Sequence, residues 1–166
     1  ENNCYQKELL IYEDYRLSKN INLKRFLSPM DISNNFLFNK FFRKITKNKI
    51  KSTKILEIKG RKIKIENFYE RIAKFKFGEL CDRNLGSEDY LSIADNCDFI
   101  FIENLPDFYE NNSNQQQRFI TLIDIIYEKK IPLMITSKVN LNSIKSSKSM
   151  IEPFKRTVSR LYELTS

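Results

Sequence analysis

The sequence has no histidine and no tryptophan, and its 166 residues include only three glycines, four prolines and three cysteines. The absence of histidine excludes imidazole-ligated zinc sites and catalysis by Ser-His-Asp or Cys-His arrangements. The cysteines are odd in number and lack CxxC spacing, which predicts reduced thiols rather than a disulfide framework. No glycine is followed by Lys and then Ser or Thr, so the sequence contains no phosphate-binding GxxxxGK(S/T) loop.

Long apolar runs are also missing. No stretch approaches the ~18 apolar residues that a membrane-spanning helix needs, and no signal-peptide pattern opens the chain. We therefore expect no transmembrane segment, and the reduced thiols indicate a cytosolic or matrix-like compartment. The first residue is Glu1 rather than Met, so we expect the chain to begin inside a longer protein or to be processed.

The C-terminal half has the clearest structural pattern. An unbroken apolar run at 99–102 predicts a strand that is covered on both faces. Residues 115–130 carry apolar side chains at the i, i+3, i+4, i+7 spacing of an amphipathic helix. A second buried strand follows at 133–135, and two such strands joined by one helix predict a parallel βαβ unit. A last helix is expected at about 152–164.

The first half predicts a mixed α+β segment. Its expected elements are a strand from Leu9 to Leu17, an extended piece at 26–27, a helix capped by Asp31 or Ser33, a hairpin turning at Lys59-Gly60, a half-exposed strand from Ile72 to Phe77, and a helix from Ser87 with Tyr90, Leu91 and Ala94 on one side. Together these patterns predict an α/β fold with a parallel-sheet βαβ core in the C-terminal half. We divide the chain into residues 1–53 and a C-terminal α/β domain at 54–166.

Charge is distributed unevenly along the chain. Residues 16–76 carry eighteen Lys or Arg against four Asp or Glu, whereas residues 77–166 carry ten against thirteen. A basic first half can attract nucleic acid or an anionic membrane surface. The alternative is compositional drift, because Lys, Asn, Ile, Phe and Tyr are all abundant, as AT-rich coding produces.

Five residues are candidates for chemistry. Glu103 follows the apolar run at 99–102, the place of the Mg²⁺-binding acid in a Walker B strand, although many parallel sheets end strands with an acid. Arg118, Arg156 and Arg160 have the planar fork that suits phosphate or carboxylate. Arg156 and Arg160 are four residues apart, hence on one helix face. Structural ion pairs are the alternative role for the three arginines and for Asp124.

Motifs across the chain resemble the C-terminal portion of the ZapE-like (AFG-type) AAA+ ATPases. They are DYRL at 14–17 and LSP at 27–29, then F, LC, LG and DYL between residues 77 and 91, then RFI at 118–120, LID at 122–124 and YE at 127–128, and finally F-x-RT-x-SRL at 154–161. Two positions depart from the family pattern. Gln117 replaces the first Arg of the family's RRFI, which puts a paired-arginine role in doubt, and Leu164 replaces an apolar Met.

The resemblance implies an ATPase whose Walker A, Walker B and first sensor motifs precede Glu1. Leu9 to Leu17 would then include the last strand of the ATPase core. The full-length protein would bind ATP and Mg²⁺ and hydrolyse ATP, whereas this segment would hold neither tightly and would contain no catalytic residue or metal ligand. A hydrolase of this family implies a role of the cell-division or mitochondrial quality-control type, in the bacterial cytoplasm or the mitochondrial matrix.

The implied partners are the missing N-terminal P-loop portion, further copies of the same protein, and a division or quality-control protein. Arg156 or Arg160 would face the nucleotide or a neighbouring subunit, as a second sensor or an arginine finger does. The alternative hypothesis is a non-enzymatic binding module whose basic 16–76 stretch contacts nucleic acid or another anionic partner.

Overall fold

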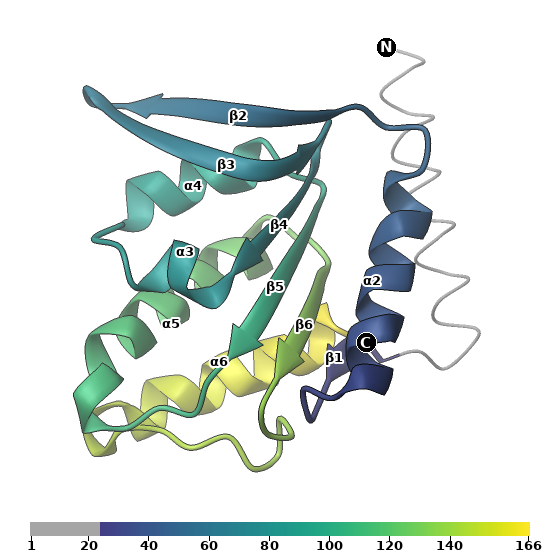
Figure 1. The fold of residues 1–166 in the computed structure, drawn as a ribbon. Helices are drawn as coiled ribbons and strands as arrows, with labels where there is room; N and C mark the ends of the chain where they lie inside the picture. The colour runs from purple at the N-terminus through teal and green to yellow at the C-terminus, as the bar shows by residue number, and fades with distance from the viewer. Residues whose placement is uncertain (1–23) are drawn as a thin grey trace.

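The computed structural model describes residues 24–166, which form one six-stranded sheet with helices on both faces (Figure 1). The main elements are β1 (Phe26–Leu27), α2 (Ile32–Thr46), β2 (Lys51–Ile58), β3 (Arg61–Tyr69), β4 (Ile72–Lys76), α3 (Phe77–Cys81), α4 (Ser87–Asp95), β5 (Phe99–Leu105), α5 (Ser113–Glu128), β6 (Leu133–Ser137) and α6 (Ile151–Leu164). The strand order is β1-β6-β5-β4-β3-β2. Strands β1, β6, β5 and β4 are parallel, and β4, β3 and β2 pair antiparallel.

Strand β5 separates two apolar cores. Ile100 and Ile102 join the core beneath α3, α4, α5 and α6, while Phe99 and Phe101 join the core beneath α2. Successive side chains of a strand point to opposite faces, so an uninterrupted apolar run requires a cover on each face. The sequence prediction of a doubly covered strand, and of a parallel βαβ unit formed by β5, α5 and β6, is confirmed.

Helix α2 forms the layer on the second face of the sheet. Asp31 caps its first turn, since the Asp31 carboxylate accepts a hydrogen bond from the Asn34 N–H at 2.7 Å. Phe38 and Phe42 of α2 meet Phe101 of β5 edge-on, with the rings of Phe38 and Phe101 5.4 Å apart. The predicted helix and its Asp31 cap are therefore confirmed.

The β2–β3 hairpin turns where the sequence predicts. Lys59 and Gly60 both have positive φ, 48° and 78°, which a tight two-residue hairpin loop requires and glycine adopts without strain. Arg61 then reaches Asp89 on α4 at 2.7 Å. The other oxygen of the Asp89 carboxylate accepts the Gly86 N–H at 2.7 Å, so one buried side chain caps α4 and fixes the hairpin to it.

Strand β4 corrects one expectation. The alternation from Ile72 to Phe77 predicted a half-exposed strand, but four of the five residues of β4 are buried or half-buried and only Lys76 is exposed. Lys74 is accommodated there because its ammonium lies 4.5 Å from the centre of the Phe42 ring and 3.5 Å from the Glu103 carboxylate. Lys74, a charged residue of the alternating pattern, is therefore covered by α2 rather than facing solvent.

Three further expectations have different outcomes. Tyr90 and Ala94, predicted on one side of their helix, are buried, but Leu91, predicted beside them, is 40% exposed. The proposed strand at 9–17 lies outside the described residues. The division at residue 53 stays a prediction, although β1 and α2 contact the sheet formed by the later strands.

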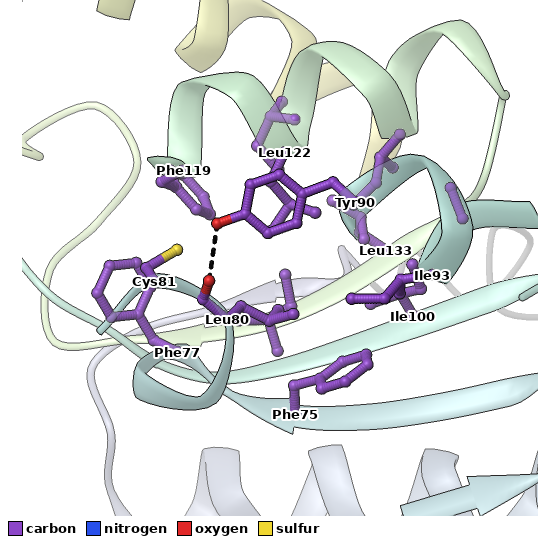
Figure 2. Packing of buried hydrophobic residues seen from close by; sticks show 14 of the residues in the cluster. Phe75, Phe77, Leu80, Cys81, Tyr90, Ile93, Ile100, Phe119, Leu122 and Leu133 are labelled. Atoms are coloured by element: carbon purple, nitrogen blue, oxygen red, sulfur yellow. Dashed lines mark hydrogen bonds between the residues drawn. The ribbon is translucent and has the colours of Figure 1, made fainter. Parts of the chain in front are cut away.

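The larger core surrounds Tyr90 (Figure 2). The Tyr90 hydroxyl donates to the Leu80 carbonyl at 2.7 Å and thereby satisfies the one polar atom of this side chain in apolar surroundings. Phe119 of α5 and Cys81 of α3 both lie near this hydroxyl (Figure 2). Burial raises the pKa of both the Tyr90 phenol and the Cys81 thiol.

Arg25 joins the two ends of the described chain. Its guanidinium is fully buried, donating from Nε to the Leu133 carbonyl at 3.0 Å and from Nη2 to the Leu164 carbonyl at 2.8 Å. The Arg25 backbone N–H donates to the Thr165 carbonyl at 2.8 Å. The start of β1, the start of β6 and the end of α6 are therefore held together by one side chain and its backbone.

Replacing Arg25 with Met should lower the free energy of unfolding by about 2 to 3 kcal/mol, because two buried carbonyls lose their charged donor. Urea unfolding followed by far-ultraviolet circular dichroism measures this change. The neighbouring exposed residue provides a control, and Lys24→Met should change stability by less than about 0.5 kcal/mol. Similar values for the two variants would contradict a structural role for the Arg25 guanidinium.

Candidate functional site

Helices α5 and α6 bring three of the five candidate residues together. The Asp124 carboxylate on α5 accepts hydrogen bonds from both arginines of α6: Oδ2 from Arg156 at 3.1 Å and Oδ1 from Arg160. Residues 156 and 160 lie one turn apart on the helix, so both guanidinium groups approach α5 from the same side. The structural ion pairs considered as an alternative role for these residues are thus present.

Two further side chains complete the group. The Tyr127 hydroxyl donates to the Glu163 carboxylate at 2.8 Å, and the Arg160 guanidinium lies 4.7 Å from the centre of the Tyr127 ring. This hydrogen bond to Glu163 raises the pKa of the Tyr127 phenol above its ordinary value. We call Asp124, Tyr127, Arg156, Arg160 and Glu163 the α5–α6 polar cluster.

Amphipathic helices account for the position of the cluster. The apolar side of α6 turns Phe154 and Leu161 into the core, and α5 does the same with Phe119 and Ile123. Polar residues one turn apart therefore remain along the outer seam between the two helices. Within the cluster, Arg160 is held by an ion pair and a ring, which makes it the more fixed of the two arginines.

Arg156 is the cation that remains available. Its side chain is 52% exposed, compared with 23% for Arg160, and its hydrogen bond to Asp124 uses one nitrogen. A guanidinium has five N–H donors in a planar fork, so the rest of the Arg156 group can still bind a carboxylate or phosphate with two parallel hydrogen bonds. The cluster can therefore present one oriented cation to an anionic group on another part of the protein or on a partner.

Arg118 does not belong to the cluster. Its Nη1 donates to the Cys81 carbonyl at the end of α3, at 2.8 Å, and the side chain is half-buried. The bond satisfies a carbonyl that the short helix α3 leaves without an intrahelical partner. Arg118 therefore joins α5 to α3 rather than approaching Arg156 or Arg160.

Glu103 lies near the carboxyl end of β5, where the Walker B comparison expects it, and it forms an ion pair with Lys74 at 3.5 Å. The neighbouring Thr136 hydroxyl accepts the Asn104 N–H at 3.1 Å, and the Ser137 hydroxyl donates to the Leu105 carbonyl at 3.1 Å. These side chains thus satisfy backbone groups where β5 and β6 end.

These residues do not fit a Mg²⁺–ATP site. Mg²⁺ is bound by oxygen ligands together with nucleotide phosphates, and here a single carboxylate, that of Glu103, is already paired with a lysine. Within residues 24–166, no group of three or more Cys, Asp or Glu side chains is arranged to hold a metal ion. We therefore derive no step of nucleotide chemistry from the described residues.

A pocket of about 810 Å³ lies at the opposite end of the parallel strands from Glu103, next to the cluster. It is formed where β4, β5 and β6 begin, and Tyr127 and Glu163 contribute to its wall together with Arg25 and Cys97. Ligands of open α/β sheets bind beyond the carboxyl ends of the parallel strands. This pocket lies at their amino ends and does not match that arrangement.

Sequence reasoning missed Tyr127, Glu163 and Arg25 as contributors to this region. Tyr127 lies one helical turn after Asp124, and Glu163 lies one turn after Arg160. This spacing is the signal that could have linked Tyr127 and Glu163 to the candidate residues. Arg25 gave no such signal, because its surroundings come from residues more than 100 positions away.

Comparison with known proteins extends over most of the chain. A family model described as AFG1-like ATPase matches residues 11–166. The chain is 24% identical to the cell division protein ZapE of Escherichia coli over 153 residues, which cover 92% of this chain and 41% of ZapE. It is 32% identical to lactation elevated protein 1 homolog B of Danio rerio over 97 residues, 58% of this chain and 19% of that protein.

The chain therefore spans less than half the length of either of these two relatives. No solved structure matches it. Among residues 24–166, no helix has the length and apolar content required to cross a membrane.

The two contacts of Asp124 should differ in strength. A double-mutant cycle of Asp124→Ala and Arg160→Ala, measured by urea unfolding at low salt, should give a coupling energy of about 1 kcal/mol, because this pair is partly shielded from solvent. The cycle with Arg156→Ala should give less than about 0.5 kcal/mol. The exposed Lys155–Glu152 pair is the control, at about 0.3 kcal/mol. Equal coupling for the two arginines would disagree with the geometry.

The Cys97 thiol, beside the pocket, should be unreactive in the folded protein. Burial raises its pKa to about 12, so at pH 8 its thiolate is about a thousandfold scarcer than that of an ordinary thiol. In a Cys4→Ser, Cys81→Ala background, Ellman's reagent should modify Cys97 at least about 100-fold more slowly than in urea.

The raised pKa also has a consequence for stability. Below the pKa of Cys97 in the unfolded chain, the thiol is protonated in both the folded and the unfolded state, and burying it adds to the free energy of unfolding. This contribution is lost as the pH rises from that unfolded pKa towards 12, because only the unfolded chain then releases the proton. Rapid modification of the folded protein at pH 8 would contradict the burial of this thiol.

Proposed function

The chain belongs to the AFG1-like ATPase family, and on that premise we propose that it is the part of an ATP-hydrolysing protein that lies C-terminal to the phosphate-binding loop. The proposal rests on the contrast between how much of the chain the family model matches and the motif that the chain lacks. The family match spans residues 11–166, yet the sequence has no GxxxxGK(S/T) loop. The P-loop, ATP binding and Mg²⁺ binding are accordingly assigned to a portion that precedes Glu1.

In this proposal the α5–α6 polar cluster is the contact that senses the nucleotide-bearing portion or a neighbouring subunit. Arg156 supplies the cation, since it is the more exposed of the two arginines. Asp124 and Arg160 are positioning residues: Asp124 orients both guanidinium groups, and Arg160 braces α6 against Tyr127. Gln117 leaves one cation fewer on α5 than the family pattern has, so the role does not depend on an arginine pair there.

The biological setting is proposed from the relatives. One relative is by name a cell division protein of a bacterium, and another comes from a fish. The proposed location is the bacterial cytoplasm or the mitochondrial matrix, as the family resemblance implies. A homo-oligomer, or a complex with a division or quality-control protein, is the proposed assembly. Residues 1–53 would connect to the ATPase core, and residues 54–166 would form the C-terminal α/β domain.

One observation favours a second candidate, a binding module for an anionic partner. Many cations of the 16–76 stretch form ion pairs with carboxylates or are buried, as Arg25 is, but those on the outer side of α2 are exposed and unpaired within the described residues. Compositional drift explains the number of lysines but not their grouping on one side of one helix.

Arg156→Ala in the full-length protein should lower ATP turnover by at least about tenfold, the effect of removing one charge-assisted contact. Lys155→Ala is the matched control, because Lys155 is exposed on the same helix and pairs only with Glu152 among the described residues. Turnover should be measured with purified protein of confirmed fold and oligomeric state. Unchanged turnover in Arg156→Ala would remove the sensing role, and equal losses in both variants would indicate a general charge effect.

A further inference from the structure

Helix α2 carries a continuous row of exposed cations and apolar groups on the side that faces away from the sheet. We call this row the α2 ridge. Its members, all exposed, are Ile32, Phe36, Lys40, Arg43 and Lys44 of α2 and Lys47, the residue that directly follows the helix. At 100° per residue these positions fall on one side of the helix, opposite the buried Phe38, Phe41, Phe42 and Ile45.

The ridge is positive throughout. No Asp or Glu occurs between residues 32 and 56, and none of the four ridge cations forms an ion pair with any residue that the structure describes. Several other cations of the basic stretch are paired with carboxylates, for example Lys49 with Glu70 at 3.7 Å and Lys59 with Glu88 at 2.7 Å. Four adjacent unpaired charges repel one another, so this surface is complementary to a strongly anionic partner.

The ridge also exposes apolar side chains. Ile32 is 91% exposed and Phe36, one turn further along, is 57% exposed. Ile55, at 56%, lies on the face of β2 opposite the buried Leu56, hence on the same side of the sheet as α2. Three large apolar groups therefore accompany the charges on one side of the molecule.

We propose that the α2 ridge binds the surface of an anionic lipid bilayer. Cations attract the acidic headgroups, each strengthening binding by about fivefold near such a surface. Ile32 and Phe36 insert between headgroups, where exposed aliphatic and aromatic side chains are stabilised. The helix lies on the membrane surface and does not cross it.

The shape and composition of the ridge favour lipid over the other anionic or apolar partners. Single-stranded nucleic acid is bound by aromatic stacking, and only Phe36 offers a ring there, because an isoleucine has no π-face. A protein helix or peptide binds in a groove. The ridge is the outer side of a helix, and none of its residues lines the pocket beside the cluster or a second pocket of about 680 Å³ next to α6.

The test uses full-length protein and vesicles of phosphatidylcholine with and without phosphatidylglycerol, with binding measured by co-sedimentation. Binding should require the anionic lipid and weaken as salt is raised. Changing Lys40, Arg43, Lys44 and Lys47 to Gln should reduce binding by at least about 100-fold. Ile32→Ser with Phe36→Ser should reduce it at least about tenfold at unchanged charge.

A control with the same change in charge removes four exposed lysines from other surfaces: Lys130, Lys138, Lys145 and Lys148, each changed to Gln. This variant should keep most of the binding. All variants should retain wild-type ATP turnover, because the ridge lies outside the α5–α6 polar cluster, so failure of the lipid proposal is distinct from failure of the proposed ATPase role.

Four results would overturn the proposal. In the first, the full-length protein fails to bind anionic vesicles. In the second, the control variant loses as much binding as the four-charge ridge variant. In the third, the Ile32 and Phe36 changes leave vesicle binding intact while duplex DNA binds with the same dependence on the ridge cations, which identifies a nucleic-acid surface. In the fourth, sedimentation shows a dimer that those two changes dissociate, without vesicle binding, which identifies an interface between two copies.

Discussion

The burial of β5 on both faces is the constraint on which the other elements depend. A strand whose side chains alternate between Phe and Ile exposes apolar surface on either side, so one helical layer is not enough. Helix α2 covers Phe99 and Phe101, while α3, α4 and α5 cover Ile100 and Ile102. At about 25 cal/mol per Å² of apolar surface buried, an uncovered face would lose several kcal/mol. The remaining strands extend this sheet outward from β5.

Much of the fold follows from local pattern, and the rest from contacts between distant residues. The apolar run of β5, the periodicity of α5 and the Lys59-Gly60 turn are local signals, and each predicted its element. The covering of Lys74 on β4 is not local, because Lys74 is stabilised by a ring on α2 and a carboxylate on β5. Likewise, nothing near residue 25 indicates that β1 lies beside β6.

The candidate site divides in the same way. Helical spacing placed Arg156 and Arg160 on one side of α6, and the family motifs pointed to Asp124 on α5. Their meeting depends on how α5 and α6 pack, which the sequence does not encode locally. Arg118 carries an equally good motif and yet bonds to the backbone of α3, because it lies on a different side of α5 from Asp124. The role of a motif residue thus depends on the side of the helix on which it lies and on the element that packs there.

The two surfaces proposed to act lie on opposite sides of the sheet. Helix α2, which carries the ridge, covers one face, and α5 and α6, which carry the polar cluster, cover the other (Figure 1). With the ridge against a bilayer, the intervening sheet holds Arg156 on the side of the molecule away from the lipid. Lipid headgroups would therefore not compete with the anionic group that Arg156 is proposed to bind. Charge on α2 orients the molecule, and charge on α6 remains available to the nucleotide-bearing portion or a neighbouring subunit.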